Sequence, residues 1–367
     1  MNQANLAIPL TLDEVTPQWL TQSFSLRYPG VSVVSAKVSS FFGYKPNKAK
    51  VQVEYNEAGK QAGLPENLVV KGGFQRRDES GEFTGLDIGL ELELMAYTDL
   101  TAKLDANTPR CFHVEFDPVS YSGIMLIEDL TPSGAKFLKD APSLSYAQAA
   151  AFLDAMAKFH AQWFDSSHFA AGGIFGPDSS LSERTQRLHT LYLDQMVHPE
   201  PWNFYLTQPR GAALPRQLQD AGRIAAAQAK LNELLPACSQ TIVHGDEHLG
   251  NLYLDAEGKP GFIDWCARRE PWVIGFTYFL ISTVDALDRR HWERPLLQHY
   301  LNRLNSYGAL APIFEEAWYL HRCTTLFPML TWFNNSAKWQ PEALNTRNCM
   351  RAALAVIDHN VLSLMGV

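Results

Sequence analysis

Residues 241–265 constrain the fold of this chain most, because short apolar runs alternate there with polar loop residues. Runs at 241–243, 252–254 and 261–263 predict three short strands, and the turn residues at 255–258 join the last two into a hairpin. The polar side chains that gather after the strand ends are His244, Asp246, His248, Asn251 and Asp264. Loops and strand ends are where a folded scaffold presents its chemistry, so we expect the functional site here.

The residue types in this stretch suit phosphoryl transfer. That reaction needs a carboxylate that orients the attacking hydroxyl and accepts its proton, and oxygen ligands for the magnesium ion that neutralises the triphosphate. Asp246, an amide five residues later at Asn251 and a second acid at Asp264 supply one base and two metal ligands. Asp, Asn and Gly are also ordinary turn formers, so the same residues could simply shape a loop.

The motif H-G-D-x-x-x-x-N, which starts at His244, and the tripeptide I-D-W, which ends at Trp265, resemble the aminoglycoside phosphotransferase and choline kinase group of small-molecule kinases. Within this group the pattern resembles the ecdysteroid-kinase-like branch. The resemblance spans residues 30–365 and implies a protein-kinase-like bilobal fold of the α+β class. A small antiparallel sheet and one helix would form an N-terminal nucleotide-binding lobe at 1–130. A mainly helical C-terminal lobe at 131–367 would carry the catalytic and acceptor-binding residues.

The same resemblance implies an activity and a set of roles. The activity is ATP- and Mg²⁺-dependent transfer of the γ-phosphoryl group to a hydroxyl of a small organic acceptor. Asp246 would be the catalytic base, and Asn251 and Asp264 would bind the magnesium ion. His244 would brace the loop through hydrogen bonds, and His248 would either touch the acceptor or face solvent.

A lysine in the N-terminal half is a candidate for the nucleotide phosphates. An apolar strand ends in Lys71, and kinases use such a lysine as a point charge on the phosphates. A lysine at a strand end is usually only solvated, but a helical pattern from Asp87 to Leu104 follows with Glu91 and Glu93 in its early turns. The family pattern E-x-x-x-Y matches Glu93 with Tyr97, so the resemblance implies that Glu93 positions Lys71, with Glu91 as the alternative.

Two further segments are candidates for the nucleotide. Predicted strands at 31–40 and 49–55 flank a loop, and turn groups near Ser40 could surround an anion, although an ordinary hairpin explains them equally well. The apolar run at 123–130 resembles the last strand of the lobe and the hinge. The resemblance implies that backbone groups of Ile127, Glu128 and Asp129 meet the adenine edge, and a buried edge strand would have the same sequence.

Helical patterns dominate after Thr131. The predicted helices are 145–164, 181–197, 216–235, 292–307, 313–333 and 341–364, and a further helix is predicted near the N-terminus from Thr11 to Tyr28. His160 is expected to be a core histidine. Residues 165–215 are predicted to be largely irregular and to cover the acceptor site, with Trp202, Phe204 and Tyr205 as walls or as core residues.

Composition bounds the function without selecting it. The 367 residues suffice for two lobes of the usual ~100–200 residues each. A formal net charge of -8 and the lack of a basic cluster argue against a nucleic-acid partner. Five widely spaced cysteines indicate reduced thiols rather than disulfides. With no signal sequence and no apolar run near the ~18 residues of a membrane span, we expect a cytoplasmic protein without a membrane partner.

The segment after Trp265 departs from the family pattern. Relatives carry an acid shortly before the Tyr-Phe-Leu segment, where it accepts N–H groups of the catalytic loop, and Gly275 takes that place here. Losing such an acceptor would loosen the loop by about 1 to 3 kcal/mol. Two other functions therefore stay open: a catalytically impaired nucleotide-binding or scaffold protein, and a hydrolase that uses His244, Asp246, His248 and Asp264 on a transition metal.

Overall fold

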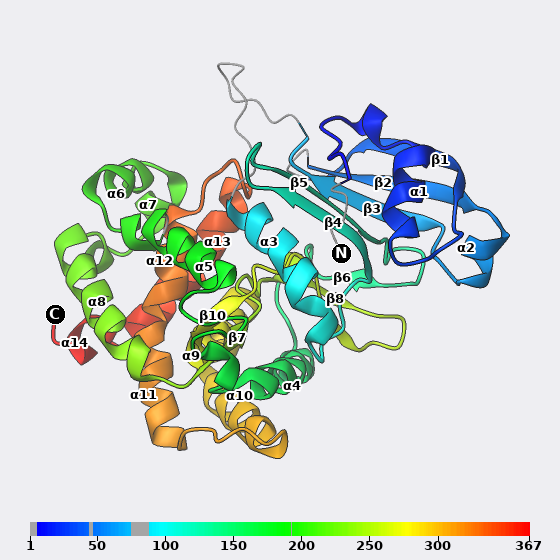
Figure 1. Cartoon of the computed structure of the whole chain (residues 1–367). Coiled ribbons are helices and arrows are strands. Elements are labelled where there is room, and N and C mark those ends of the chain that lie inside the picture. Colours follow the sequence, from blue (N-terminus) through cyan, green and yellow to red (C-terminus); the bar gives the residue numbers. More distant parts are fainter. Residues whose placement is uncertain (1–5, 44–46, 75–87, 192) are drawn as a thin grey trace. The chain divides into compact units, whose positions relative to one another are not determined.

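The computed structural model of this chain describes residues 6–43, 47–74, 88–191 and 193–367 (Figure 1). The chain divides into two compact units. Unit 1 comprises Met1–Lys103 and Thr108–Lys136, and unit 2 comprises Leu104–Asn107 and Phe137–Val367. Asp87, where the helix that carries Glu93 was expected to begin, lies outside the described residues.

Unit 1 is built on an antiparallel sheet with the strand order β1-β2-β3-β5-β4. The strands are β1 (Val33–Phe41), β2 (Lys48–Tyr55), β3 (Asn67–Gly72), β4 (Cys111–Asp117) and β5 (Ser122–Glu128). The helices of this unit are α1 (Pro17–Ser25), α2 (Glu57–Gln61) and α3 (Ile88–Asp99), with 3₁₀ turns at Leu12–Glu14 and Thr101–Lys103. The small antiparallel sheet predicted for the N-terminal part is therefore present.

The two faces of this sheet serve different purposes. Successive residues of a strand point to opposite faces, so Val70 and Lys71 face opposite ways. Val70 joins a buried apolar cluster with Leu20 and Phe24 of α1, which lies against the sheet (Figure 1). Lys71 instead meets Glu93 of α3. One face thus makes the core of unit 1, and the other presents a charged pair.

The N-terminal helix is shorter than predicted, and Thr11 does not cap it. The helix α1 begins at Pro17, and Thr16 is its cap, with Oγ1 accepting the Trp19 N–H at 3.2 Å. Proline lacks an N–H and is favoured at the first position of a helix, so a continuous helix from Thr11 through Pro17 is disfavoured. Thr11 caps only the separate 3₁₀ turn Leu12–Glu14.

Unit 2 is mainly helical and contains short strands. Its helices are α4 (Tyr146–Trp163), α5 (Ser180–Leu191), α6 (Pro199–Leu206), α7 (Pro209–Ala213), α8 (Ala221–Leu234), α9 (Trp272–Thr283), α10 (Ala286–Ser306), α11 (Phe314–Thr324), α12 (Leu326–Asn334), α13 (Glu342–Asp358) and α14 (Val361–Leu364). Strand β7 (Gln240–Val243) pairs with β10 (Arg268–Pro271), and β8 (Leu252–Leu254) pairs with β9 (Pro260–Phe262). Just after β6 (Lys136–Phe137), the Leu138 N–H donates to Leu252 O at 3.0 Å.

Helix α9 is the centre of unit 2. All its residues are buried, which is typical of a helix that is apolar on every side. It contacts α10, α11, α12 and α13 as well as β7 and β10. Strand β7 leads into the polar loop at 244–251, and the polar loop at 263–267 leads into β10. Because α9 contacts both strands, it fixes the strand ends from which these loops extend.

Residues 165–215 contain more helix than predicted: α5 corresponds to the predicted helix at 181–197 but ends at Leu191, and α6 and α7 were not predicted. They contain α5, α6 and α7, and prolines stand at the first turns of α6 and α7, where a missing N–H costs nothing. Trp202 is fully buried, with its ring centroid 4.4 Å from that of Phe333 and its Nε1–H donating to Gln219 O at 3.1 Å. Of the two alternatives for Trp202, the structure shows a core residue.

Three C-terminal helix predictions differ in their bounds. Helix α10 begins earlier than 292 because Asp285 caps it, with its carboxylate accepting the Leu287 N–H at 2.9 Å. The segment 313–333 is divided into α11 and α12 at Thr325. The segment 341–364 is divided by Asn360, whose φ of 50° ends α13. Within the described parts of the chain, no helix has the length and apolar character needed to cross a bilayer.

Candidate active site

His244 ties the polar loop to the neighbouring strand end. It follows β7 directly, and its Nε2 lies 2.8 Å from Ile263 O while its Nδ1 accepts the Asp246 N–H at 3.2 Å. Burial lowers its pKa to about 4, against the opposing charges of Asp246 and Asp264. The imidazole is therefore neutral at pH 7, with its proton on Nε2, and it connects the loop to the residue before Asp264.

Asp246 presents an ionised and partly exposed carboxylate. Oδ2 accepts from Asn251 Nδ2 at 2.9 Å and lies 3.4 Å from His248 Nε2, and Oδ1 accepts from Tyr278 Oη at 3.0 Å. Burial opposes the charge of Asp246, but His248, His244 and the Tyr278 hydroxyl outweigh it and lower its pKa to about 2. The side chain keeps 36% of its surface exposed, so a held carboxylate remains within reach of a ligand.

Asn251 lies beside Asp246, and Asp264 lies near the rings of His244 and His248. Asn251 Nδ2 also donates to Asp246 O at 2.9 Å, and its backbone oxygen accepts the Ile263 N–H at 3.0 Å. Asp264 follows with a φ of 57°, an uncommon conformation for a residue other than glycine. Its charge acts to raise the pKa of both His244 and His248, as expected for an acid near both rings.

The side-chain oxygens of Asn251 and Asp264 suit a hard divalent cation. Asn251 Nδ2 makes both of its hydrogen bonds to Asp246, so the amide oxygen of Asn251 is not used in them. That oxygen and the carboxylate of Asp264 are the ligand types that Mg²⁺ takes. The imidazoles fit a transition metal poorly, because the Nδ1 atoms of His244 and His248 already accept the N–H groups of Asp246 and Gly250. The arrangement therefore disfavours the hydrolase alternative.

His248 is buried and does not face solvent. Its Nδ1 accepts the Gly250 N–H at 2.9 Å, so Nε2 carries the proton and faces Asp246. Burial acts to lower its pKa, but the charges of Asp246 and Asp264 outweigh this and raise it. Its ring lies edge-on to Trp332, with the ring centroids 5.3 Å apart.

In unit 1 the lysine at the end of β3 is paired with Glu93. Lys71 Nζ donates to Glu93 Oε2, and the two side chains keep only 7% and 4% of their surface exposed. Glu91, the alternative partner, instead accepts from Tyr121 Oη. Between the two glutamates considered from the sequence, the ion pair thus selects Glu93.

The other nucleotide candidates of unit 1 have partners of their own. Ser40 lies at the exposed end of β1, where its carbonyl accepts from Ser39 Oγ at 2.8 Å. The N–H of Glu128 donates to Arg110 O at 2.9 Å, and the N–H of Asp129 donates to Asn67 O at 3.1 Å. These two hinge donors would have to exchange their partners to meet an adenine. Ile127 lies within β5, opposite Val69 of β3.

Comparison with known proteins places the chain in a family. Residues 87–313 match the family model described as the phosphotransferase enzyme family. The chain belongs to this phosphotransferase family. The matched range includes Glu93 and the loops that carry Asp246, Asn251 and Asp264. A search of curated proteins gives no match.

Solved structures share the fold of this phosphotransferase at low sequence identity. A candidate aminoglycoside phosphotransferase from Ralstonia eutropha JMP134 is 16% identical with a TM-score of 0.51, and 93% of this chain and 97% of that chain are covered. A GDP complex of a mutant aminoglycoside 2'-phosphotransferase-IIIa is 11% identical with a TM-score of 0.50, covering 93% and 98%. The choline kinase LicA from Streptococcus pneumoniae is 13% identical with a TM-score of 0.48, covering 93% and 98%. The first two confirm the predicted protein-kinase-like α+β fold.

Three residues that form hydrogen bonds within or to the loop at 244–251 were not anticipated as site residues. They are Glu247, Arg268 and Tyr278. Tyr278 lies on α9 one turn after Gly275, and its ring stacks on Trp332 with the centroids 6.2 Å apart. The only sequence signal for it was this spacing of about one helical turn. For Glu247 the signal was an acid directly after Asp246, which periodicity does not distinguish from a solvated loop residue.

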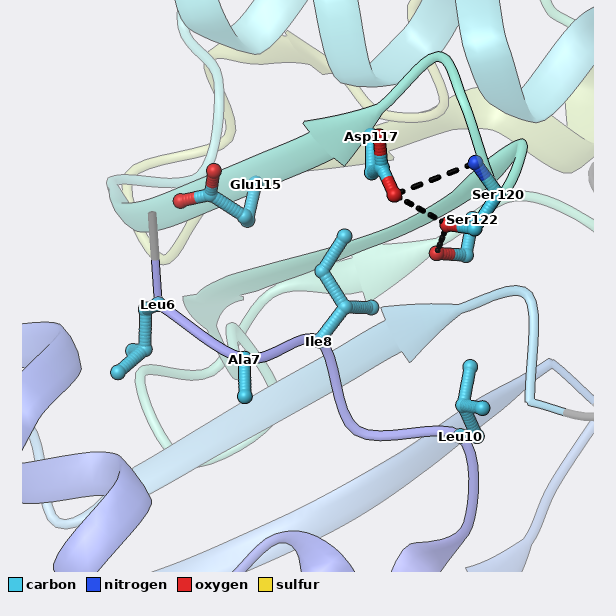
Figure 2. A pocket seen from close by; sticks show the side chains of 8 residues that line it. All are labelled: Leu6, Ala7, Ile8, Leu10, Glu115, Asp117, Ser120 and Ser122. Atoms are coloured by element: carbon cyan, nitrogen blue, oxygen red, sulfur yellow. Dashed lines mark hydrogen bonds between the residues drawn. The ribbon is translucent and has the colours of Figure 1, made fainter. Parts of the chain in front are cut away.

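The described residues of unit 1 also form a pocket of about 350 Å³, and neither Lys71 nor Glu93 is among its lining residues (Figure 2). Figure 2 shows the segment that carries Ile8 on one side and Glu115 and Asp117 of β4 on the other. Asp117 accepts the N–H and Oγ–H of Ser120, which closes the turn after β4. None of the predicted site residues of the phosphotransferase lines this pocket. It adjoins the point where the described chain begins, and we assign no ligand to it.

Proposed function

We propose that this phosphotransferase is a small-molecule kinase that uses ATP and Mg²⁺ to phosphorylate a hydroxyl of a small organic acceptor. Within the family we place it in the ecdysteroid-kinase-like branch, supported by the I-D-W tripeptide and by the pattern E-R-x-L-L-x-H-Y-L that starts at Glu293. The observation that supports the activity most is the ionised carboxylate of Asp246, held by Asn251 and Tyr278 and 36% exposed.

Asp246 acts as the base that orients the acceptor. A carboxylate with a pKa of about 2 is too weak to remove a proton from a free alcohol. In a loose phosphoryl-transfer transition state it need only align the hydroxyl and receive the proton as the new O–P bond forms. Asn251 and Asp264 would hold Mg²⁺, which when bound neutralises charge on the triphosphate. Lys71 steadies the phosphates, and Glu93 keeps its ammonium group in place.

Substitution of the base tests the activity. Asp246→Asn should lower kcat by at least about 100-fold, because an amide cannot accept the proton. Its affinity for Mg-ATP, measured by calorimetric titration, should stay within about 3-fold of wild type. Turnover is followed as ADP release over a panel of hydroxylated metabolites and antibiotics. Asp140→Asn, an exposed aspartate of unit 2, is the matched control. Equal turnover by Asp246→Asn and wild type would remove the assigned base.

A second substitution tests the metal role separately. Asp264→Ala should abolish the increase in ATP affinity that Mg²⁺ produces, because one of the two proposed oxygen ligands is gone. ATP titrations with and without Mg²⁺ measure this difference. If the variant keeps the full magnesium dependence of wild type, Asp264 is not a ligand.

A further inference from the structure

Glu247 is a buried acid inside the catalytic loop that the proposed mechanism leaves unused. Its side chain lies against the first turn of α9, and only 1% of the residue is exposed. Oε1 accepts the Gly245 N–H at 3.1 Å. A Cβ added at Gly275 would lie 3.2 Å from the same oxygen and 3.1 Å from Val243 Cγ1. The carboxylate of Glu247 therefore occupies the space that the absent side chain at Gly275 leaves.

Gly245 is held on its other side by Arg268. The Gly245 oxygen accepts from Arg268 Nη1 at 3.0 Å. Arg268 is buried and is itself fixed by Glu270, which accepts from its Nε at 3.0 Å. Gly245 has a φ of 90°, and an added Cβ would overlap Arg268 Nη1 and Cys266 O. The two peptide groups that flank Gly245 are thus fixed by one acceptor and one donor, immediately before Asp246.

We propose that Glu247 is a positioning residue for Asp246, and that its carboxylate supplies from within the loop the acceptor that Gly275 cannot supply from α9. The Gly245 N–H thus has a buried acceptor although Gly275 offers none, and on this proposal the loop is not loosened at Gly275. The catalytic consequence rests on the proposed function, whereas the structural part does not.

The acceptor role does not depend on the charge of Glu247. Burial is the largest influence on this group and raises its pKa to about 7, although the Gly245 N–H and Arg268 act to lower it. Either protonation state keeps an oxygen lone pair for the Gly245 N–H. An amide side chain of the same length should therefore replace the carboxyl group, and an apolar side chain of similar size should not.

Three variants of the full chain separate acceptor from packing. Glu247→Gln keeps an accepting oxygen, Glu247→Leu fills the space without one, and Glu247→Ala does neither. Hydrogen–deuterium exchange is measured for the peptide that contains the Gly245 amide. We expect exchange at this amide to rise at least about 10-fold in the Leu and Ala variants, and to stay within about 3-fold of wild type in the Gln variant. Exchange in Glu247→Leu equal to that of wild type would show that Glu247 only fills space, and would overturn the proposal.

Kinetics tests whether the loop position matters for catalysis. In Glu247→Leu we expect kcat to fall by about 10-fold while KM for ATP changes by less than about 3-fold, and Glu247→Gln should restore most of kcat. An unchanged kcat, or an equal change in kcat and KM, would overturn the positioning role. If wild type turns over no acceptor, the proposed function fails while the exchange experiment still decides whether Glu247 holds Gly245.

Discussion

At the residue scale, the carboxylate of Asp246 is held by donors of different origin. Asn251 and His248 follow it in the same loop, whereas Tyr278 comes from α9. The bonds from Asn251 and Tyr278 reach different oxygens, so together they fix the rotation of the carboxylate about its own axis. A charged acceptor strengthens each bond, because hydrogen bonds to ions are about twice as strong as neutral ones.

Removal of one hydroxyl tests this arrangement. Tyr278→Phe keeps the ring stacked on Trp332 but loses the bond to Asp246 Oδ1. We expect kcat to fall by about 10-fold with little change in KM for ATP, as measured by steady-state kinetics. Tyr253→Phe is the matched control, since its buried hydroxyl donates to Asn107 Oδ1 at 2.9 Å rather than to Asp246. Similar kcat values for the two variants would contradict an orienting role of Tyr278.

Two glycines with positive φ make a second test at this scale. Gly245→Ala brings a methyl group onto Arg268 and Cys266, whereas Gly258→Ala meets nothing within 4 Å at a φ of 79°. The strained backbone alone costs about 1 to 2 kcal/mol in each variant. We expect Gly258→Ala to lose that much in the free energy of unfolding and Gly245→Ala to lose at least about 2 kcal/mol more. Urea denaturation measures both, and equal losses would show that the Gly245 site can relax.

At the scale of elements, a buried arginine joins three helices of unit 2. Arg210 of α7 is fully buried and donates to Trp332 O and Phe333 O at 3.0 Å each, at the end of α12. It also donates to Glu342 Oε1 at 3.1 Å, in the first turn of α13. The carbonyls at a helix end have no partner inside the helix, so Arg210 supplies donors that α12 needs.

Loss of this arginine should destabilise the fold strongly. Arg210→Met leaves the buried α12 carbonyls and the partly exposed Glu342 without this donor, and we expect a loss of about 3 to 5 kcal/mol in the free energy of unfolding. Arg210→Lys keeps the charge but cannot reproduce the planar fork, so it should recover only part of that loss. Urea denaturation monitored by circular dichroism measures both variants. A loss below about 1 kcal/mol in Arg210→Met would refute this role.

A second buried network joins α10, α11 and the end of α13. Glu293 Oε2 lies 3.0 Å from His359 Nε2 and 3.7 Å from His321 Nε2, a grouping that could hold a metal ion. Arg289 Nη1 donates to the same oxygen at 2.6 Å, so a cation already occupies this place. Burial opposes the charge of Glu293, but the two histidines and Arg289 outweigh it and hold its pKa well below the usual range. We interpret the cluster as a charge network that joins these helices.

At the scale of the whole molecule, buried neutral histidines link stability to pH. Burial lowers the pKa of His160 to about 3 and that of His244 and His113 to about 4. In the unfolded chain each takes up a proton near its ordinary pKa of about 6.5. Below that pH these histidines bind protons in the unfolded state but stay neutral in the folded state until the pH approaches their lowered pKa values. These histidines therefore lower the free energy of unfolding as the pH falls from about 6.5 toward their folded pKa values.

Replacement of one histidine isolates this effect. His160 is fully buried, with Nδ1 2.6 Å from Tyr300 Oη. Between pH 6 and 4, the free energy of unfolding of His160→Gln should fall less steeply than that of wild type, by about 1.4 kcal/mol per pH unit. Urea denaturation at pH 7.5, 6, 5 and 4 gives the two slopes. Parallel slopes would mean that His160 is protonated in the folded protein.

The features of the fold and site that could be predicted depend on residues close together in the sequence. The strands around residues 241–265 follow from short apolar runs. The bond from Asn251 to Asp246 follows from their five-residue spacing inside one loop. The pairing of Lys71 with Glu93 could be predicted because a strand and the next helix in the sequence carry the two residues. Helices α6 and α7 were missed, because prolines and glycines there suggested loops, whereas burial of residues such as Trp202 organises these segments as helices.

By itself, the sequence determined the residue types of the loop at 244–251, their order and their local contacts, because short loops leave few conformations for neighbours such as His244 and Asp246. Only the tertiary structure decided which distant side chains complete the loop. Tyr278 is 32 residues from Asp246, and Arg268 is 23 residues from Gly245. It also decided that Glu247 is buried against Gly275 rather than solvated. The burial and hydrogen-bond partners of these side chains depend on how remote segments pack, which no local pattern of residues specifies.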